Sequence, residues 1–130
     1  YEISACLVGS EMCIRDSNLV EAMASDLRLM ALDILSLVPS RNFMLEMENG
    51  RLNIRFHDNA RPVGTGAVEK YLESRGFKPV KSEVDRVLGA SMEVYRKLYG
   101  DGLSVELSII YDDDGGRVIL ISASMLYNPR

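Results

Sequence analysis

An Asn49-Gly50 pair separates two runs in which apolar and polar residues alternate, over 42–48 and 51–57. Asn-Gly favours a type I′ turn, whose two central residues both need positive φ. The two-residue loop fixes a register with one apolar face, pairing Phe43 with Phe56, Leu45 with Ile54 and Met47 with Leu52. The other face is mostly polar, pairing Met44 with Arg55, Glu46 with Asn53 and Glu48 with Arg51. A half-buried sheet requires this separation, so we predict a β-hairpin.

A second hairpin is predicted from Leu103–Tyr111 and Arg117–Ala123, with Asp114-Gly115 as its turn. This turn would place Tyr111 opposite Val118, Ile109 opposite Leu120 and Ile110 opposite Ile119. Both faces carry apolar residues, so we expect the hairpin to lie at the centre of the sheet or to be covered on both sides. The residues after it, Met125–Arg130, are expected to form a tail or to contact a partner.

Three helices are predicted where apolar residues recur at spacings of three and four, over 18–38, 66–75 and 82–99. Pro39 ends the first and Gly76 the second, while Ser82 and Asp85 form a capping box for the third. The first helix has a wide apolar stripe, which indicates burial on more than one side or a dimer contact. The order α-β-β-α-α-β-β predicts an α+β fold, a four-stranded antiparallel sheet with helices packed on one face.

Residues 1–17 differ from the rest, because their apolar residues follow neither a helical nor a strand period. They are no signal peptide, since they lack a basic start and an apolar run. The stretch LVGSEMCIRDS, over 7–17, resembles the conceptual translation of a transposon-end adapter used in sequencing libraries. The resemblance implies a non-native leader, disordered or loosely attached, on a truncated fragment whose single domain spans 18–130. The alternative is an ordinary flexible N-terminal arm.

Composition excludes several classes of function. Both cysteines, Cys6 and Cys13, lie in this leader, so residues 18–130 hold no thiol for a disulfide, a metal site or nucleophilic catalysis. The net charge of −4 gives no support to nucleic-acid binding, which needs a basic excess. No apolar run is long enough to cross a membrane. We therefore expect a soluble, cytoplasmic protein.

The densest polar segment, over 57–66, follows a predicted strand and begins a predicted helix. Free N–H groups at a helix start, flexible glycines and a nearby arginine are the ingredients of an anion site. The candidate ligand-binding residues for a phosphate or carboxylate are His57, Arg61, Gly64, Thr65, Gly66 and Lys70. The alternative is structural, with Thr65 as the helix cap and the glycines in a turn.

Two further polar groups invite a catalytic or metal-binding hypothesis. His57, the only histidine, precedes Asp58, but adjacent strand residues point to opposite faces, so we interpret it as an ordinary residue at a strand end. The run Asp112-Asp113-Asp114 could attract Mg²⁺ or Ca²⁺, yet consecutive side chains do not converge on one point, and we interpret it as a solvated turn. We predict no catalytic residue, no metal site and no cofactor.

These observations favour a small non-enzymatic binding or regulatory module that acts through protein–protein contacts, with another protein or with itself as a homodimer. The alternative is a small-anion-binding protein or enzyme that uses the Arg61–Gly66 loop. RNA binding is the weakest hypothesis. Arg51, Arg55 and Arg61 fall close together, but Glu46 and Glu48 share their face, and no exposed aromatic pair is evident for base stacking.

Overall fold

A computed structural model describes residues 10–112 and 116–128, with side chains described for 18–112 and 116–128. The predicted α+β class is confirmed, but the described residues form six strands rather than four and two helices rather than three. The elements follow in the order α1 (Ser10–Leu37), β1 (Phe43–Glu48), β2 (Arg51–Phe56), α2 (Ala67–Ser74), β3 (Lys78–Asp85), β4 (Ala90–Gly100), β5 (Leu103–Asp112) and β6 (Val118–Tyr127).

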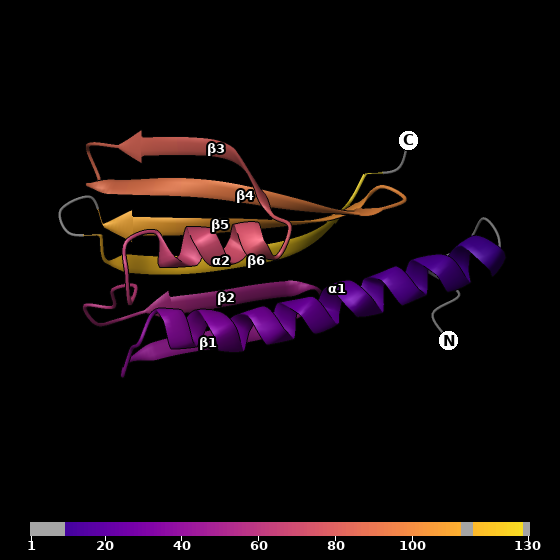
Figure 1. The fold of residues 1–130 in the computed structure, drawn as a ribbon, viewed down its shortest axis with the longest axis horizontal. Coiled ribbons are helices and arrows are strands. Elements are labelled where there is room, and N and C mark those ends of the chain that lie inside the picture. Colours follow the sequence, from indigo (N-terminus) through magenta and orange to yellow (C-terminus); the bar gives the residue numbers. More distant parts are fainter. Residues whose placement is uncertain (1–9, 113–115, 129–130) are drawn as a thin grey trace.

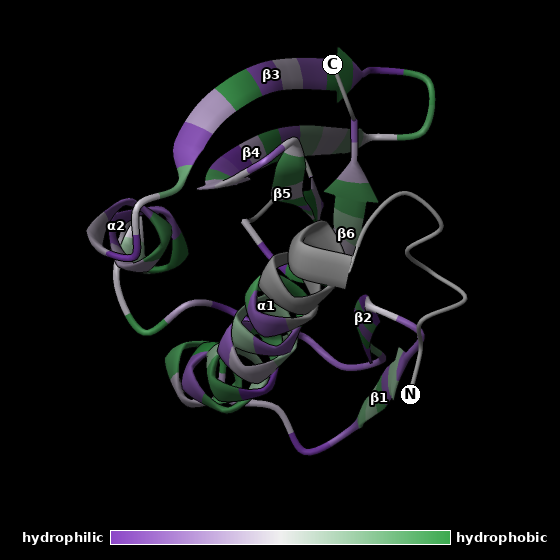
Figure 2. Ribbon diagram, turned by 90° about the vertical axis from the view of Figure 1, so that its right-hand side faces the viewer, coloured by the Kyte–Doolittle hydropathy of each residue, from purple (hydrophilic) through white to green (hydrophobic). Residues whose placement is uncertain are grey.

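The six described strands form one antiparallel sheet in the order β1-β2-β6-β5-β4-β3 (Figure 1). The sheet is curved, and both helices lie on its concave side (Figure 2). The core fills the space between these layers, where Met23 and Ile34 of α1 are buried with Ile54, Leu107 and Ile121 of the sheet. Neither helix of the described chain is long and apolar enough to cross a membrane.

The first hairpin has the predicted register at every pair from Phe43–Phe56 to Glu48–Arg51. Both turn residues have positive φ, 52° at Asn49 and 74° at Gly50, as a type I′ turn requires. Gly50 is also close to the neighbouring strand, because a Cβ there would lie 2.9 Å from Cε of Met125. The Asn-Gly pair therefore set both the turn and the register.

The second hairpin, β5 and β6, lies at the centre of the sheet, as predicted from its two apolar faces. Tyr111 pairs with Val118 as predicted, but Ile109 pairs with Ile121 and Ile110 with Leu120. Between these pairs, β6 has one extra residue, Ile119, which has no partner on β5. A register set by a symmetric two-residue turn does not include such a bulge. The turn itself, over 113–115, lies outside the described residues. The predicted tail is wrong for Met125–Tyr127, which belong to β6.

The predicted third helix over 82–99 is wrong, because these residues form β3, β4 and the turn between them. Two residues of the supposed apolar stripe, Val87 and Leu88, lie at the turn and are 95% and 78% exposed. Asp85, assigned to a capping box, instead accepts hydrogen bonds from the main-chain N–H groups of Val87 and Leu88, each at 3.0 Å. Side-chain bonding of this kind stabilises turns as well as helix starts.

A strand period is present in the second half of the same segment. Alternate residues of β4 lie on the concave face, since they pair with the concave-face residues of β5. They are Ser91, Glu93, Tyr95 and Lys97. Tyr99 falls at a register shift of this pairing, and its hydroxyl reaches Asp26 of α1 on the same face. The helical spacing of apolar residues across the turn concealed this period, and Pro79 fits the strand because β3 is an edge strand.

The helix α1 packs on the sheet by one face. Its buried side chains follow the predicted spacing and include Met23, Leu27, Met30 and Ile34. Leu29 and Leu32, at 51% and 68% exposed, are on the opposite face, so burial on several sides is wrong. The helix begins at Ser10, before the predicted start at Asn18. Residues 1–9 and the Cys13 side chain lie outside the described residues, and the non-native origin of the leader stays a prediction.

The helix α2 ends at Ser74, and Gly76 follows it in a Schellman motif, which confirms the predicted glycine cap. Gly76 has a φ of 94°, and its N–H donates to the carbonyl of Glu73 at 3.1 Å. The N–H of Phe77 donates to the carbonyl of Leu72 at 2.9 Å, and both side chains are buried. This cap turns the chain from α2 directly into β3.

Candidate functional site

The predicted anion loop is held to the rest of the fold by main-chain bonds near its middle. The N–H of Val63 donates to Leu37 at the end of α1, and the N–H of Val118 in β6 donates to Ala60, at 2.8 and 2.9 Å. Asp58 accepts from the Ser40 hydroxyl at 2.7 Å, a bond that lowers the pKa of this carboxyl group. Asp58 therefore joins two loops and is bonded away from His57.

At the start of α2, the structure brings Gly66 and Lys70 together. The Cε of Lys70 lies 4.0 Å from where a Gly66 Cβ would be. Gly66, with a φ of 69°, is the N-cap, and no side chain caps the helix, so the alternative role predicted for Thr65 is wrong. Most of the predicted loop residues are exposed: His57, Arg61, Gly64, Thr65 and Lys70. Among the described residues, no side-chain hydrogen bond or ion pair fixes the position of His57, Arg61 or Lys70. Anion binding stays a prediction.

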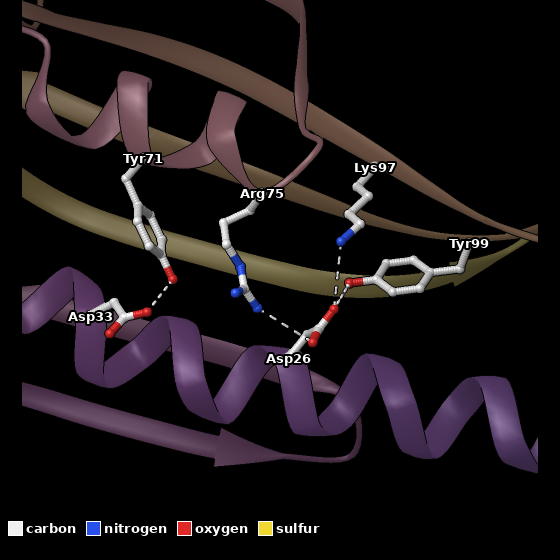
Figure 3. Close-up of polar contacts among 6 residues, drawn as sticks. All are labelled: Asp26, Asp33, Tyr71, Arg75, Lys97 and Tyr99. Carbon is white, nitrogen blue, oxygen red and sulfur yellow. Dashed lines mark hydrogen bonds and ion pairs between the residues drawn. The ribbon is translucent and has the colours of Figure 1, made fainter.

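A first polar cluster surrounds Asp26 of α1 (Figure 3). The Tyr99 hydroxyl donates to its carboxylate at 2.6 Å. Arg75, after α2, and Lys97, on β4, approach the same carboxylate at 3.5 and 3.6 Å. Lys97 also lies 4.9 Å from the Tyr99 ring centre, within cation–π distance. One carboxylate thus links α1, α2 and the sheet.

Two more tyrosines bind carboxylates in the same way. Tyr71 of α2 donates to Asp33 of α1 at 2.6 Å (Figure 3), and Tyr111 of β5 donates to Glu69 of α2 at 2.6 Å. Burial raises the pKa of each hydroxyl well above its usual range, and the hydrogen-bonded carboxylate raises the pKa further. These hydroxyls are neutral donors near pH 7. Tyr71 joins the two helices, and Tyr111 holds α2 to the sheet.

A pair of carboxyl groups, Glu69 of α2 and Glu93 of β4, lies beside Tyr111. Burial raises the pKa of Glu93, and the hydrogen bond and negative charge of Glu69 raise it further. Tyr95 donates to Glu93 at 3.4 Å. Among the described residues, no group of three or more potential metal ligands gathers here or elsewhere. This cluster was not predicted, because Glu93 and Tyr95 were expected on a helix. The two-residue period of β4 was the signal for it.

The open edge of β1 has a different character. Main-chain groups of β1 alternate between the β2 side and the open side, and the His57 N–H donating to the Asn42 carbonyl assigns even-numbered residues to β2. The N–H and C=O groups of Phe43, Leu45 and Met47 therefore point away from the sheet. Phe43 and Leu45 remain 41% and 40% exposed, and Met44, on the other face, is 53% exposed. We call these residues, 43–47, the β1 edge.

The opposite edge of the sheet is protected against strand pairing. Pro79 of β3 lacks an N–H donor, and charged residues alternate along the strand. Lys81 and Glu83 form an ion pair at 2.8 Å. Proline and charge on an edge strand are the usual means of preventing association, whereas the β1 edge has apolar residues at its first three positions. The two edges are therefore unequal in their capacity to bind.

Comparison with known proteins adds no assignment, because the chain matches no family, no characterised protein and no solved structure to a significant degree.

Proposed function

We propose that this protein is a non-enzymatic binding module that acts through protein–protein contacts, with the β1 edge as its binding surface. The observation that carries the proposal is at Phe43 and Leu45, where main-chain groups without a strand partner among the described residues coincide with exposed apolar side chains. An added strand would satisfy the main-chain groups and cover the side chains together. Strand addition obtains affinity from the first effect and specificity from the second.

The apolar gain from covering the β1 edge would be modest. Full burial of a Leu or Phe side chain contributes roughly 1.5–3 kcal/mol. Phe43 and Leu45 are about two-fifths exposed, so covering them would contribute about 1 kcal/mol each. Main-chain hydrogen bonds add roughly 0.5–1.5 kcal/mol each. These terms would favour a moderate, reversible association.

We assign the polar clusters a structural role. The carboxylates of Asp26, Asp33 and Glu69 each accept a short tyrosine hydrogen bond from another element. Their contacts account for how the helices are held, and we assign them no catalytic step.

Binding of a small anion at the Arg61–Gly66 loop is the second candidate. The position of Lys70 beside Gly66, at the start of α2, favours it, because a cation and helix N–H groups would act on the same ligand. Inorganic phosphate is a suitable probe. Saturable shifts of the Gly66 and Lys70 amide signals that are lost in Arg61→Ala would support this candidate, and unsaturable shifts would contradict it.

Site-specific photocrosslinking tests the β1 edge directly. A photoreactive phenylalanine analogue is placed at Glu46 of β1 or, as the control, at Glu83 of β3, and both variants are irradiated in the cells that produce them. We expect a discrete protein adduct from position 46 and little from position 83, because the β1 edge is apolar, whereas Pro79 and the charged residues of β3 oppose strand pairing. Equal adducts from the two positions, or none from position 46, would contradict the proposal.

A further inference from the structure

The partner that the β1 edge fits best is a second copy of the same edge. We propose that two copies pair their β1 strands antiparallel about a twofold axis at Leu45, so that their sheets join into one. The inference rests on the proposed function and names its partner.

The main-chain geometry allows this centre. In an antiparallel pair, residues whose N–H and C=O groups point at each other form the hydrogen-bonded positions. Centring on Leu45 places Leu45 opposite Leu45 of the second copy, and Phe43 opposite Met47 of the second copy. These three residues are the ones whose main-chain groups point to the open edge. The strand thus supplies matching donors and acceptors over its whole open length.

The side chains support the same register. On the concave face, Phe43, Leu45 and Met47 would meet only one another, so the exposed apolar surface of each copy is covered by that of the other. On the convex face, Met44 would lie opposite Glu46 of the second copy. A centre at Glu46 would instead oppose two identical carboxylates, which is unfavourable in a cross-strand pair. A centre at Met44 would place Met47 opposite Arg41 of the second copy, outside β1, and would leave it without a strand partner. Leu45 is therefore the favoured centre.

The other edge cannot offer an equivalent pairing. Pro79 interrupts the donors of β3, and Lys81 and Glu83 already form an ion pair. If β1 paired with β3 of a second copy, the new strand pair would include Pro79, which has no N–H donor, and the carboxylate of Glu83. Pairing through the two β1 strands is twofold symmetric, so it gives a closed dimer, which is the usual form of a homodimer.

Sedimentation velocity over a range of concentrations measures the association. We expect a concentration-dependent dimer for the full chain and a dissociation constant raised at least tenfold in Leu45→Lys, which places two ammonium groups at the axis. Val80→Lys is the matched control, since Val80 is an exposed apolar residue of β3, at 47% compared with 40% for Leu45. It should dimerise like the original chain. A chain that stays monomeric at every concentration would overturn the inference.

A second measurement is independent of any loss of folding in Leu45→Lys. Leu45→Cys, in a chain with Cys6→Ser and Cys13→Ser, should form an intermolecular disulfide on mild oxidation. The Cα atoms of directly opposed, hydrogen-bonded residues lie about 5.5 Å apart, which is within the range of Cα distances in disulfides. Val80→Cys should not. Disulfide formation at position 80 alone, or at both positions equally, would overturn the inference. If the photocrosslinked adduct at position 46 contains a different protein and no dimer forms, the self-pairing fails while the proposed function stands.

Discussion

Leu45 of β1 and Ile54 of β2 are cross-strand partners on the same face of the sheet, yet Leu45 is 40% exposed and Ile54 is fully buried. The apolar face of the sheet therefore extends one strand beyond the surface that the helices cover. Covering that strand would remove apolar surface from water and satisfy main-chain groups in a single step. This relationship is the basis for placing the binding surface at the β1 edge.

The Tyr99–Asp26 hydrogen bond should contribute to stability. Tyr99→Phe removes a 2.6 Å bond to a carboxylate and keeps the aromatic ring, so we expect a loss of about 1 kcal/mol in the free energy of unfolding. Urea denaturation followed by circular dichroism measures it. Tyr127→Phe is the control, because Tyr127 is 56% exposed, and it should change stability by much less. Equal effects of the two substitutions would contradict the assigned role of Asp26.

The buried tyrosines should make the protein sensitive to alkali. Folding raises the pKa of Tyr111 above its usual value of 10.0, first by burial and then through Glu69. The unfolded chain loses this proton first as the pH rises, so the stability contribution is complete below pH 10 and is lost above it. Thermal unfolding at pH 8–11 should show a steeper decline for the original chain than for Tyr111→Phe. Identical slopes would contradict the raised pKa.

The Glu69–Glu93 pair should also lower the stability of the fold as the pH rises, but at a lower pH than Tyr111 does. Folding raises the pKa of Glu93 above its usual 4.5, so the folded state keeps a proton that the unfolded state loses. The stability that the protonated Glu93 contributes is complete below pH 4.5, and it disappears as the pH rises through the pKa of Glu93 in the folded state. Glu93→Gln should therefore gain stability relative to the original chain as the pH rises from 4 to 8. Glu73→Gln, an exposed position on α2, serves as the control and should show no such gain.

Gly50 should be the least replaceable turn residue. Gly50→Ala places a side chain at a φ of 74° and 2.9 Å from Cε of Met125, and we expect a loss of about 1–2 kcal/mol. Gly64→Ala has open space around it and is the matched control. It should be neutral or stabilise by a few tenths of a kcal/mol, since alanine restricts the unfolded chain. A loss at Gly64 as large as that at Gly50 would contradict the turn geometry.

The sequence predicted structure best where local chemistry determines it. Asn49-Gly50 specified a turn whose geometry fixes the pairing of Phe43 with Phe56, and Gly76 specified the end of α2. The segment 82–99 was misassigned because its apolar spacing fits a helix, while its tertiary pairing with β5 requires a strand. Propensity is a weak guide when sheet neighbours decide the outcome.

The candidate site was less predictable for a related reason. The apolar residues of β1 could be identified from the sequence, but their exposure depends on how far α1 and α2 cover the sheet. The Asp26 cluster joins residues from three elements that are distant in sequence, such as Tyr99 of β4. No spacing rule connects such residues before the fold is known. The anion loop, in contrast, had a recognisable local pattern, and its ligand stays a prediction.

Amide hydrogen exchange at Leu45 is the most direct test of the β1 edge as a binding surface. Its N–H points to the open edge, whereas those of Met44 and Glu46 point to β2 and provide internal references. The proposed pairing predicts that the Leu45 amide exchanges rapidly in dilute solution and at least tenfold more slowly at concentrations where the protein associates, with Met44 and Glu46 little changed. Association that leaves the exchange rate of Leu45 unaltered would contradict it.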